Sequence, residues 1–401
     1  RPPHRPPRPY GPYAPQGGYL SSVVVDCADP ALGPYPLSDA LWALADGGVL
    51  FVRARGGVCR ETLYIDRPVT IVGEGAPAFG GGEAQPARLA PAAGAPCIRV
   101  APGTRGVELR DLVIESGQGG RSACIEAVDA EVALVGSYVR YSGEAVAIFA
   151  SGGRLVARDT TIEARSNDAA VLADTATLDF TRVRIAADTR GLDITPAAGE
   201  SRLTQVGVIA EGGSLPGSTG VTVRGLRSGG GKLVVRNSYI GGFITGVYVD
   251  RGARLDLVRS RIRARRGIIS DWGEVAVRES AVWGDEYGGY FAGGAPVIEY
   301  NRFGGPRGGL LFEGQTRPTL QPNHLYASDA CDPYGYGQGL YCQPARQAPY
   351  GLFASPMELS GAPYGDGYGW AYDGYDRAYQ SYGPPQPFAP APLPPPRRGL
   401  R

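Results

Sequence analysis

Several acidic and basic residues in this chain have the types and spacing that acid–base chemistry or cation binding would need. Three aspartates, Asp174, Asp250 and Asp271, each end a short apolar segment, and Arg266 lies near the last two in sequence. Clustered carboxylates can transfer protons or bind Ca²⁺, and an arginine can hold a uronate carboxylate. The alternative interpretation is that these residues lie at bends and form outward ion pairs.

A basic stretch and the aromatic residues that follow it suggest a binding surface. Residues 254–266 read RLDLVRSRIRARR, and strand alternation predicts that Arg259, Arg261, Arg263 and Arg265 lie largely on one outer face. Trp272, Trp283, Tyr287 and Tyr290 come soon after. Arginines beside aromatic side chains favour an anionic glycan or a lipid headgroup as ligand. The alternative is a solvated face that nearby aspartates neutralise in part.

Metal and nucleophile chemistry find little support in the sequence. The two histidines, His4 and His324, are far apart, and the six cysteines form no C-x-x-C pair, so no zinc site is expected. Calcium is the one cofactor that the acidic residues would suit. Serines and threonines recur at fixed places, but no neighbouring histidine would activate them.

The composition restricts the partner and the compartment. The 401 residues include 40 basic and 39 acidic ones, which argues against a nucleic-acid partner. No run of 18 apolar residues is present, so we expect no transmembrane span. The chain begins at Arg1, and Met357 is its only methionine, from which we expect that a targeting segment has been removed.

An internal repeat predicts the fold. An eight-residue pattern, apolar-x-apolar-x-x-(Ser, Thr or apolar)-x-apolar, recurs every 20–30 residues from Val107, and a short second strand separates its copies. Such a period with several strands indicates an all-β solenoid, a right-handed parallel β-helix of about eight to ten coils. The repeated hydroxyl position would stack into an internal ladder that satisfies its own hydrogen bonds. Its members are Ser137, Thr160, Ser238, Ser260 and Ser280.

The segments around this rod are expected to differ from it. Residues 1–20 form a Pro/Arg-rich tail, 21–315 the β-helix, 316–360 a C-terminal cap and 361–401 a Tyr/Gly/Pro-rich tail. Both tails are expected to be disordered, because they cannot bury enough apolar surface. A helix over residues 37–46, capped by Ser38, would close the N-terminal end.

Six cysteines, an even number, are typical of an oxidising compartment. They allow 15 pairings, and the sequence does not decide among them. Position along the coils suggests Cys27 with Cys59, Cys97 with Cys124, and Cys331 with Cys342.

Residues 37–75 resemble the opening of pectin-lyase-fold proteins. A capping helix is followed by the pattern G-x-apolar-V-x-x-G-x-x-x-E-x-apolar-x-I-x-x-P-V-T-apolar-x-G, with matches that include Gly57, Glu61 and Pro68. The resemblance extends over roughly residues 22–315 and implies the β-helix fold. The catalytic motifs of pectinesterases are absent, since LDFTRV around Asp179 only echoes one of them. The catalytic motifs of alginate epimerases and polygalacturonases are absent as well.

Two functions follow as expectations. The first is an exported β-helix of the cell envelope or surface that binds polysaccharide, or another envelope component, or acts as a rigid adhesive module without catalysis. The second is a polysaccharide lyase or pectinesterase-like enzyme acting on a uronate-containing glycan. The sequence decides neither the glycan nor the oligomeric state.

Overall fold

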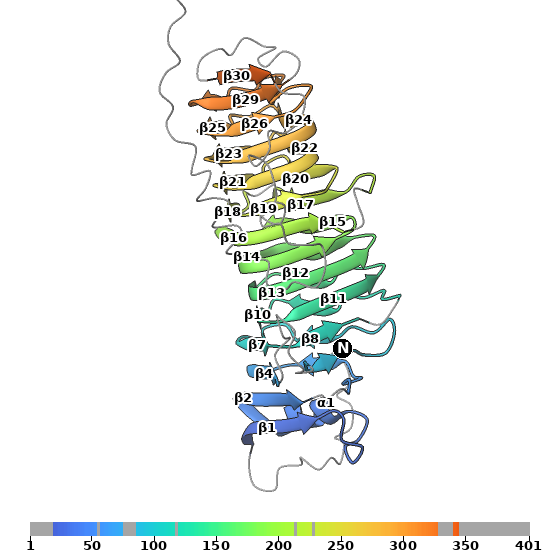
Figure 1. Ribbon diagram of the computed structural model, residues 1–401. Helices are drawn as coiled ribbons and strands as arrows, with labels where there is room; N and C mark the ends of the chain where they lie inside the picture. The colour runs from blue at the N-terminus through green and yellow to red at the C-terminus, as the bar shows by residue number, and fades with distance from the viewer. Residues whose placement is uncertain are drawn as a thin grey trace, which may run out of the picture.

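The protein is an all-β parallel solenoid of about 12 turns, and the described residues contain one short helix, which lies between the first two strands. The computed structural model describes residues 19–53, 57–74, 86–116, 119–211, 215–226, 229–327 and 340–344. Figure 1 shows the rod, with β1 at one end and β30 at the other. Adjacent parallel strands lie about 4.8 Å apart, so 12 turns give a rod of roughly 60 Å. The predicted fold class is confirmed. The turns exceed the eight to ten expected, because residues 20–100 also form coils.

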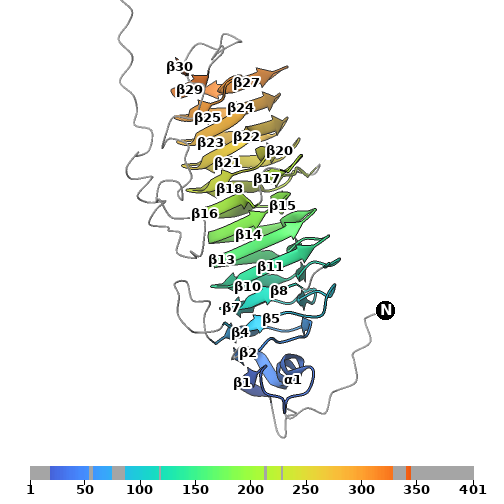
Figure 2. The ribbon, with the colours of Figure 1, turned by 45° about the vertical axis from the view of Figure 1, so that its right-hand side comes forward.

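Along most of the rod, each turn contributes a strand, or part of a longer strand, to each of three parallel lanes. Lane 1 consists of β1 (Leu20–Asp26), β2 (Leu44–Arg53), β4 (Val69–Gly73), β7 (Val107–Arg110), β10 (Glu131–Val135), the start of β13 (Arg154–Ser166), the middle of β14 (Ala169–Ala187), the start of β16 (Glu200–Ala210), β18 (Lys232–Arg236), β21 (Arg254–Val258), β23 (Glu274–Arg278), β25 (Val297–Glu299) and β28 (Thr319–Leu320). Figure 2 shows many of these strands one above another.

Lane 2 follows lane 1 after a sharp bend. It consists of β5 (Arg88–Leu89), β8 (Val113–Glu115), β11 (Tyr138–Gly143), the ends of β13, β14 and β16, β19 (Tyr239–Gly241), the starts of β22 (Arg261–Asp271) and β24 (Ala281–Ala292), β26 (Arg302–Gly304), β29 (Asn323–Ala327) and β30 (Leu340–Pro344). The stack therefore continues past residue 315, where a separate cap was expected to begin.

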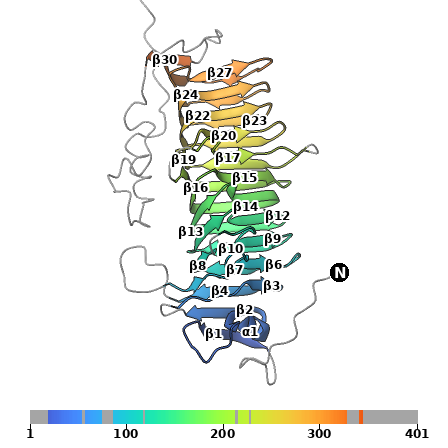
Figure 3. The same cartoon turned by 90° about the vertical axis from the view of Figure 1, so that its right-hand side faces the viewer.

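Lane 3 completes each turn. It consists of β3 (Leu63–Ile65), β6 (Ile98–Val100), β9 (Ile125–Val128), β12 (Ile148–Ser151), the start of β14, β15 (Arg190–Pro196), β17 (Thr219–Val223), β20 (Thr245–Val249), the ends of β22 and β24, and β27 (Leu310–Glu313). Figure 3 shows most of these strands running up the rod.

The bend between lanes 1 and 2 explains the eight-residue pattern. One residue with positive φ lies at this bend in nine successive coils, and eight of the nine are not glycine: Asp111, Gly136, Asp159, Arg182, Gln205, Asn237, Arg259, Glu279 and Tyr300. A single left-handed residue turns the chain sharply from one extended strand to the next. Apolar residues on both sides then point into one continuous core of Val, Ile, Leu and Ala side chains.

The hydroxyl ladder lies directly after this bend and is structural. The backbone N–H of Ser238 donates to Ser260 Oγ at 3.2 Å, and the N–H of Ser260 donates to Ser280 Oγ at 3.1 Å. Asn301 and Asn323, which the pattern did not predict, continue the ladder through their side-chain amides. All five side chains are buried. The ladder therefore pairs buried polar groups from coil to coil, as the sequence suggested.

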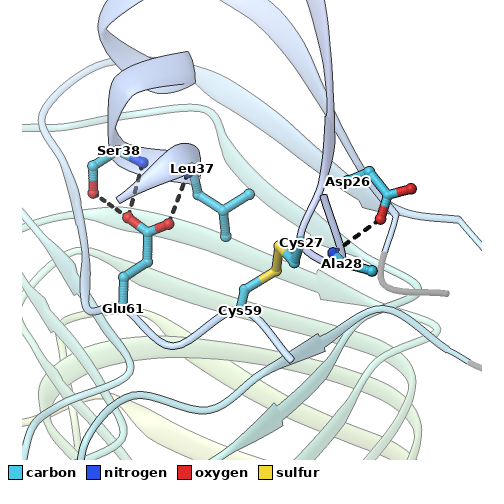
Figure 4. The surroundings of a disulfide bond; sticks show 7 residues. All are labelled: Asp26, Cys27, Ala28, Leu37, Ser38, Cys59 and Glu61. Carbon is cyan, nitrogen blue, oxygen red and sulfur yellow. Dashed lines mark hydrogen bonds between the residues drawn. A yellow bond between two sulfur atoms is a disulfide. The ribbon is translucent and has the colours of Figure 1, made fainter. Parts of the chain in front are cut away.

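The N-terminal end is closed by α1 (Pro36–Ala43), which packs on β1, β2 and β3. Ser38 is not the helix cap as predicted, since Tyr35 takes that position and Pro36 begins the helix. The buried carboxylate of Glu61 accepts hydrogen bonds from the N–H groups of Leu37 and Ser38, at 2.7 and 3.0 Å, and from Ser38 Oγ (Figure 4). The glutamate of the pectin-lyase-like pattern thus satisfies the first turn of the helix.

Two disulfides link this end of the rod. Cys27 is bonded to Cys59 (Figure 4), and Cys97 to Cys124, both as the sequence suggested. The second bond joins neighbouring coils, ahead of β6 and β9. The third suggested pair includes Cys331, which lies outside the described residues. The two expected tails, apart from the few residues next to β1, also lie outside them.

Candidate functional site

The predicted arginine and aromatic surface is divided among several sides of the rod. Arg259 lies at the bend before lane 2, Arg261, Arg263 and Trp283 lie in lane 2, and Arg265 lies at the bend before lane 3. Tyr287 and Tyr290 lie in lane 3, and Trp272 lies at the bend that follows it. The prediction of one outer face is wrong, because it assumed one uninterrupted strand where the chain bends twice.

Glutamates of the next coil neutralise much of the basic stretch. Arg254 pairs with Glu274 at 3.0 Å, and Arg259 pairs with Glu279 at 2.8 Å. The sequence suggested aspartates of the same region as the neutralising groups, but stacking brings residues 20 positions later into contact. These pairs are partly exposed and contribute little stability each.

Arg266 is likewise held by a glutamate and not by the predicted aspartates. Glu286 accepts from Arg265 Nε at 2.7 Å and from Arg266 Nε at 2.8 Å. The hydrogen bond from Arg266 is the main reason that the pKa of Glu286 lies below its usual value. Arg266 and Asp271 are five residues apart on one extended strand, about 16 Å, so they do not form one catalytic cluster.

The three predicted aspartates do share one row on the outer face of lane 3. The strand register places Asp174, Thr195, Arg224, Asp250 and Asp271 at equivalent positions of successive coils. Asp250 and Asp271 are therefore immediate neighbours, about 4.8 Å apart along the rod. Asp174 lies three coils away from Asp250, so it belongs to a different part of the face.

A buried aspartate that the sequence did not reveal anchors this face. Asp193 in β15 points outward, since Leu192 and Ile194 beside it lie in the core, yet only 1% of it is exposed. Its two oxygens accept from Arg224 Nε and Nη2, both at 2.7 Å, and from Arg190 Nη1 at 2.6 Å. Arg190 also binds Asp168. The hydrogen bond to Asp193 is the first cause of the raised pKa of Arg224.

Tyr248 connects the anchor to the aspartate pair. It points outward from β20 between Val247 and Val249, which lie in the core. Burial, followed by the charges of Asp250 and Asp271, raises the pKa of its phenol, which therefore remains a hydrogen-bond donor at neutral pH. Within the described residues, neither Asp250 nor Asp271 has an ion-pair partner within 4.0 Å. We call Asp193, Arg224, Tyr248, Asp250 and Asp271 the lane 3 site.

An exposed tryptophan borders the site. Trp272 follows Asp271 at the bend, and 45% of it is exposed. A Cβ added at Gly293 would lie 2.5 Å from ring atoms of Trp272, so the indole packs closely against the next coil. Arg251 lies 5.7 Å from the ring centroid. The indole is thereby held in place at the bend that follows Asp271.

The lane 3 site contains no recognisable metal centre. Across the described ranges, no group of three or more His, Cys, Asp or Glu side chains is placed to hold a metal ion. Nor does any helix of the described chain have the length and apolar character needed to span a membrane. What the site offers is hydrogen bonding: two carboxylates without ion-pair partners, a phenol donor and a rigid Arg–Asp pair.

The comparisons with known proteins identify no family. No family model matches the chain, and no curated protein matches it. A solved structure described as Geobacillus virus E2 ORF18 is similar over 80% of this chain, with 11% sequence identity and a TM-score of 0.29. The matched region spans 60% of that chain. Similarity at this level says nothing about activity.

Proposed function

We propose that the protein is an exported β-solenoid of the pectin-lyase-fold type that binds a polysaccharide along the outer face of lane 3. The observation that carries the proposal is the lane 3 site, where donors and acceptors repeat from coil to coil. A linear polymer lying along the rod would meet Arg224, Tyr248, Asp250 and Asp271 in turn, about 4.8 Å apart along the rod where they occupy neighbouring coils. The two disulfides are compatible with export to an oxidising compartment.

The charges of the face favour a neutral glycan over a uronate polymer. Arg190 and Arg224 are opposed by four carboxylates, those of Asp168, Asp193, Asp250 and Asp271. A carboxylated polymer would be repelled by Asp250 and Asp271, while sugar hydroxyls would donate hydrogen bonds to them. A sugar ring of the bound polymer would also contact the edge of the Trp272 indole.

A polysaccharide lyase or pectinesterase-like activity is the second candidate, motivated by the adjacent carboxylates of Asp250 and Asp271. Such a reaction also needs an arginine aimed at the substrate. Arg224 holds Asp193 through two hydrogen bonds, Arg251 lies 5.7 Å from the ring centroid of Trp272, and Arg266 holds Glu286 at the far end of its strand. Binding without turnover is therefore the better-supported function.

The test is retention of the full-length protein on a panel of neutral and uronate polysaccharides, with and without Ca²⁺. We expect retention on a neutral polymer and a loss of affinity of about tenfold or more in D250N/D271N, because a hydrogen bond to a charged group contributes about 1.5–3 kcal/mol. The matched control is D179N, whose carboxylate lies on the lane 1 face and pairs with Arg154 at 2.8 Å. Unchanged binding in D250N/D271N would refute the site. Release of unsaturated product or methanol would establish the enzyme.

A further inference from the structure

The outer face of lane 3 carries one continuous row of side chains from eight successive coils. The strand register places each of these residues beside its equivalent in the next coil, from Phe149 in β12 to Leu311 in β27. Their neighbours along each strand are buried, most of them in the core, so the row itself points away from the rod. We call these eight residues the lane 3 row.

The end of the lane 3 row nearer the N-terminus is apolar. Phe149 and Leu172 lie in neighbouring coils, and both are partly exposed. They pack against a small buried cluster that is separate from the core and consists of Ala123, Val146 and Ala169. The rod therefore has an apolar platform on its outside at this level.

The other end of the lane 3 row is also mainly apolar, and polar side chains separate the two ends. Ile269, Tyr290 and Leu311 lie in three neighbouring coils and are partly exposed. The polar residues between the ends belong to β15, β17 and β20 and are Asp193, Thr222 and Tyr248. The row thus reads apolar, polar, apolar along the rod.

Such a row is self-complementary when two copies pack face to face with their rods antiparallel. A two-fold axis that runs between β17 and β20 brings Phe149 of one copy opposite Leu311 of the second copy. It brings Leu172 opposite Tyr290 of the second copy. Each contact occurs twice, because both sides of a two-fold interface use the same patch. Asp193 adds no unpaired charge, since its carboxylate is 1% exposed and holds two arginines of its own chain.

The charged residues beside the lane 3 row select this register. Two positions further along the strands, the same axis brings Arg224 opposite Asp250 of the second copy. It brings Asp174 opposite Ala292, so no two carboxylates face each other there. Shifting the register by one coil in either direction would oppose like charges, Arg224 with Arg224 or Asp250 with Asp250. Such contacts are unfavourable and exclude the wrong register.

The area of the face is sufficient for a weak specific pair. Eight strands about 4.8 Å apart, each contributing four or five residues of about 3.3 Å, give roughly 500–600 Å² per copy. The pair would bury about 1,100 Å², which is at the lower end for specific protein–protein interfaces. We therefore expect a dissociation constant on the order of micromolar.

We propose that two copies of the protein associate through their lane 3 faces as an antiparallel pair, with the two-fold axis between β17 and β20. The pairing does not depend on polysaccharide binding. Because both would occupy lane 3, a bound polysaccharide and a second copy exclude each other. At protein concentrations well below the dissociation constant of the pair, the face is free.

Sedimentation velocity of the full-length protein without polysaccharide tests the pairing and its register. We expect a reversible monomer–dimer equilibrium. A292R should tighten it by about two- to thirtyfold, since it adds two exposed ion pairs with Asp174 per dimer. A292D should weaken it, and D174N/A292R should lose the gain. The matched control is A276R, because Ala276 is a partly exposed residue on the outer face of lane 1. A monomer at all concentrations, or equal effects of A292R and A292D, would overturn the proposal.

A second measurement locates the contact directly. A photo-crosslinking amino acid replaces Leu172, or Val258 on the outer face of lane 1 as a control, in a mixture of isotopically light and heavy full-length protein. We expect crosslinks from position 172 that join light to heavy chains and end near Tyr290, and none from position 258. Crosslinks from position 172 that stay within one chain, or that reach lane 1 of another chain, would contradict the pairing. Because polysaccharide is absent, that result would leave the retention test of the proposed function unaffected.

Discussion

Replacing Asp193 by asparagine tests whether the lane 3 site is organised by a buried ion pair. Asp193 is 1% exposed and accepts three charge-assisted hydrogen bonds, one from Arg190 and two from Arg224. Asparagine keeps the shape, but its NH₂ group would face guanidinium donors and its charge is lost.

The loss of unfolding free energy expected for D193N depends on how exposed the two arginine partners of Asp193 are. Breaking a fully buried ion pair costs about 3–5 kcal/mol. The side chains of Arg190 and Arg224 are 31% and 46% exposed, so water can replace part of what they lose. We therefore expect D193N to cost about 2–3 kcal/mol. The control is D159N, which removes another bidentate ion pair, that of Asp159 with Arg182. Both of these side chains are more than 40% exposed, so we expect D159N to cost about 0.2–1 kcal/mol.

Amide hydrogen exchange is the suitable assay, because a solenoid can open coil by coil and a single unfolding midpoint would mix these events. In D193N, amides of β15 and β17 should exchange roughly 30- to 150-fold faster, which corresponds to the expected 2–3 kcal/mol. The faster exchange in D193N should persist in 1 M salt, because the ion pair is buried. The smaller effect of D159N should disappear there, because the Debye length falls to about 3 Å and exposed charges are screened. Equal effects of the two variants would refute the argument from burial.

Three further variants test other parts of the structure. S260V should cost about 1–3 kcal/mol in unfolding free energy, because the buried N–H of Ser238 loses its acceptor; S151A, outside the ladder, should cost much less by the same denaturation measurement. Burial raises the pKa of Glu61, so the folded protein favours the protonated carboxyl group. The unfolding free energy of the wild type relative to E61Q should therefore increase as pH falls through the raised pKa and decrease as pH rises through it. A difference between the two proteins that does not change with pH would contradict this. Replacing both Cys97 and Cys124 by alanine should cost about 2–4 kcal/mol in thermal or chemical unfolding, and no loss relative to wild type would show that this bond adds no stability.

The sequence predicted the solenoid because the repeat records the inward side of each coil. Every coil buries Val, Ile or Leu at the same places, and the ladder at Ser238, Ser260 and Ser280 lies at a fixed distance from them. Periodicity is local, so it is visible in one sequence. The expected number of coils was too low because residues 20–100 lack the full eight-residue pattern.

The outer face was harder to predict, because its contacts join residues 20–30 positions apart. Asp193 lies in an ordinary apolar strand, and its importance depends on Arg224 in the next coil of lane 3, 31 residues later. A signal was present, since a charged residue interrupts the apolar string GLDIT. The bend at Arg259 separated the arginines that strand alternation had placed together.

The role of Glu61 could not be predicted from the pattern that contains it and is explained only by the structure. The glutamate belongs to the pectin-lyase-like opening, and its carboxylate satisfies the first turn of α1. The similarity in this segment therefore reflects how the rod is closed at its end. It carries no information about catalysis.

The most direct test of the account is to locate the bound polysaccharide on the rod. Hydrogen exchange followed by mass spectrometry would compare the free protein with the protein saturated by a neutral polysaccharide that retains it. We expect slower exchange in β15, β17, β20 and the lane 3 part of β22, and unchanged exchange in lane 1 strands such as β18 and β21. Protection on lane 1, or none in lane 3, would contradict it.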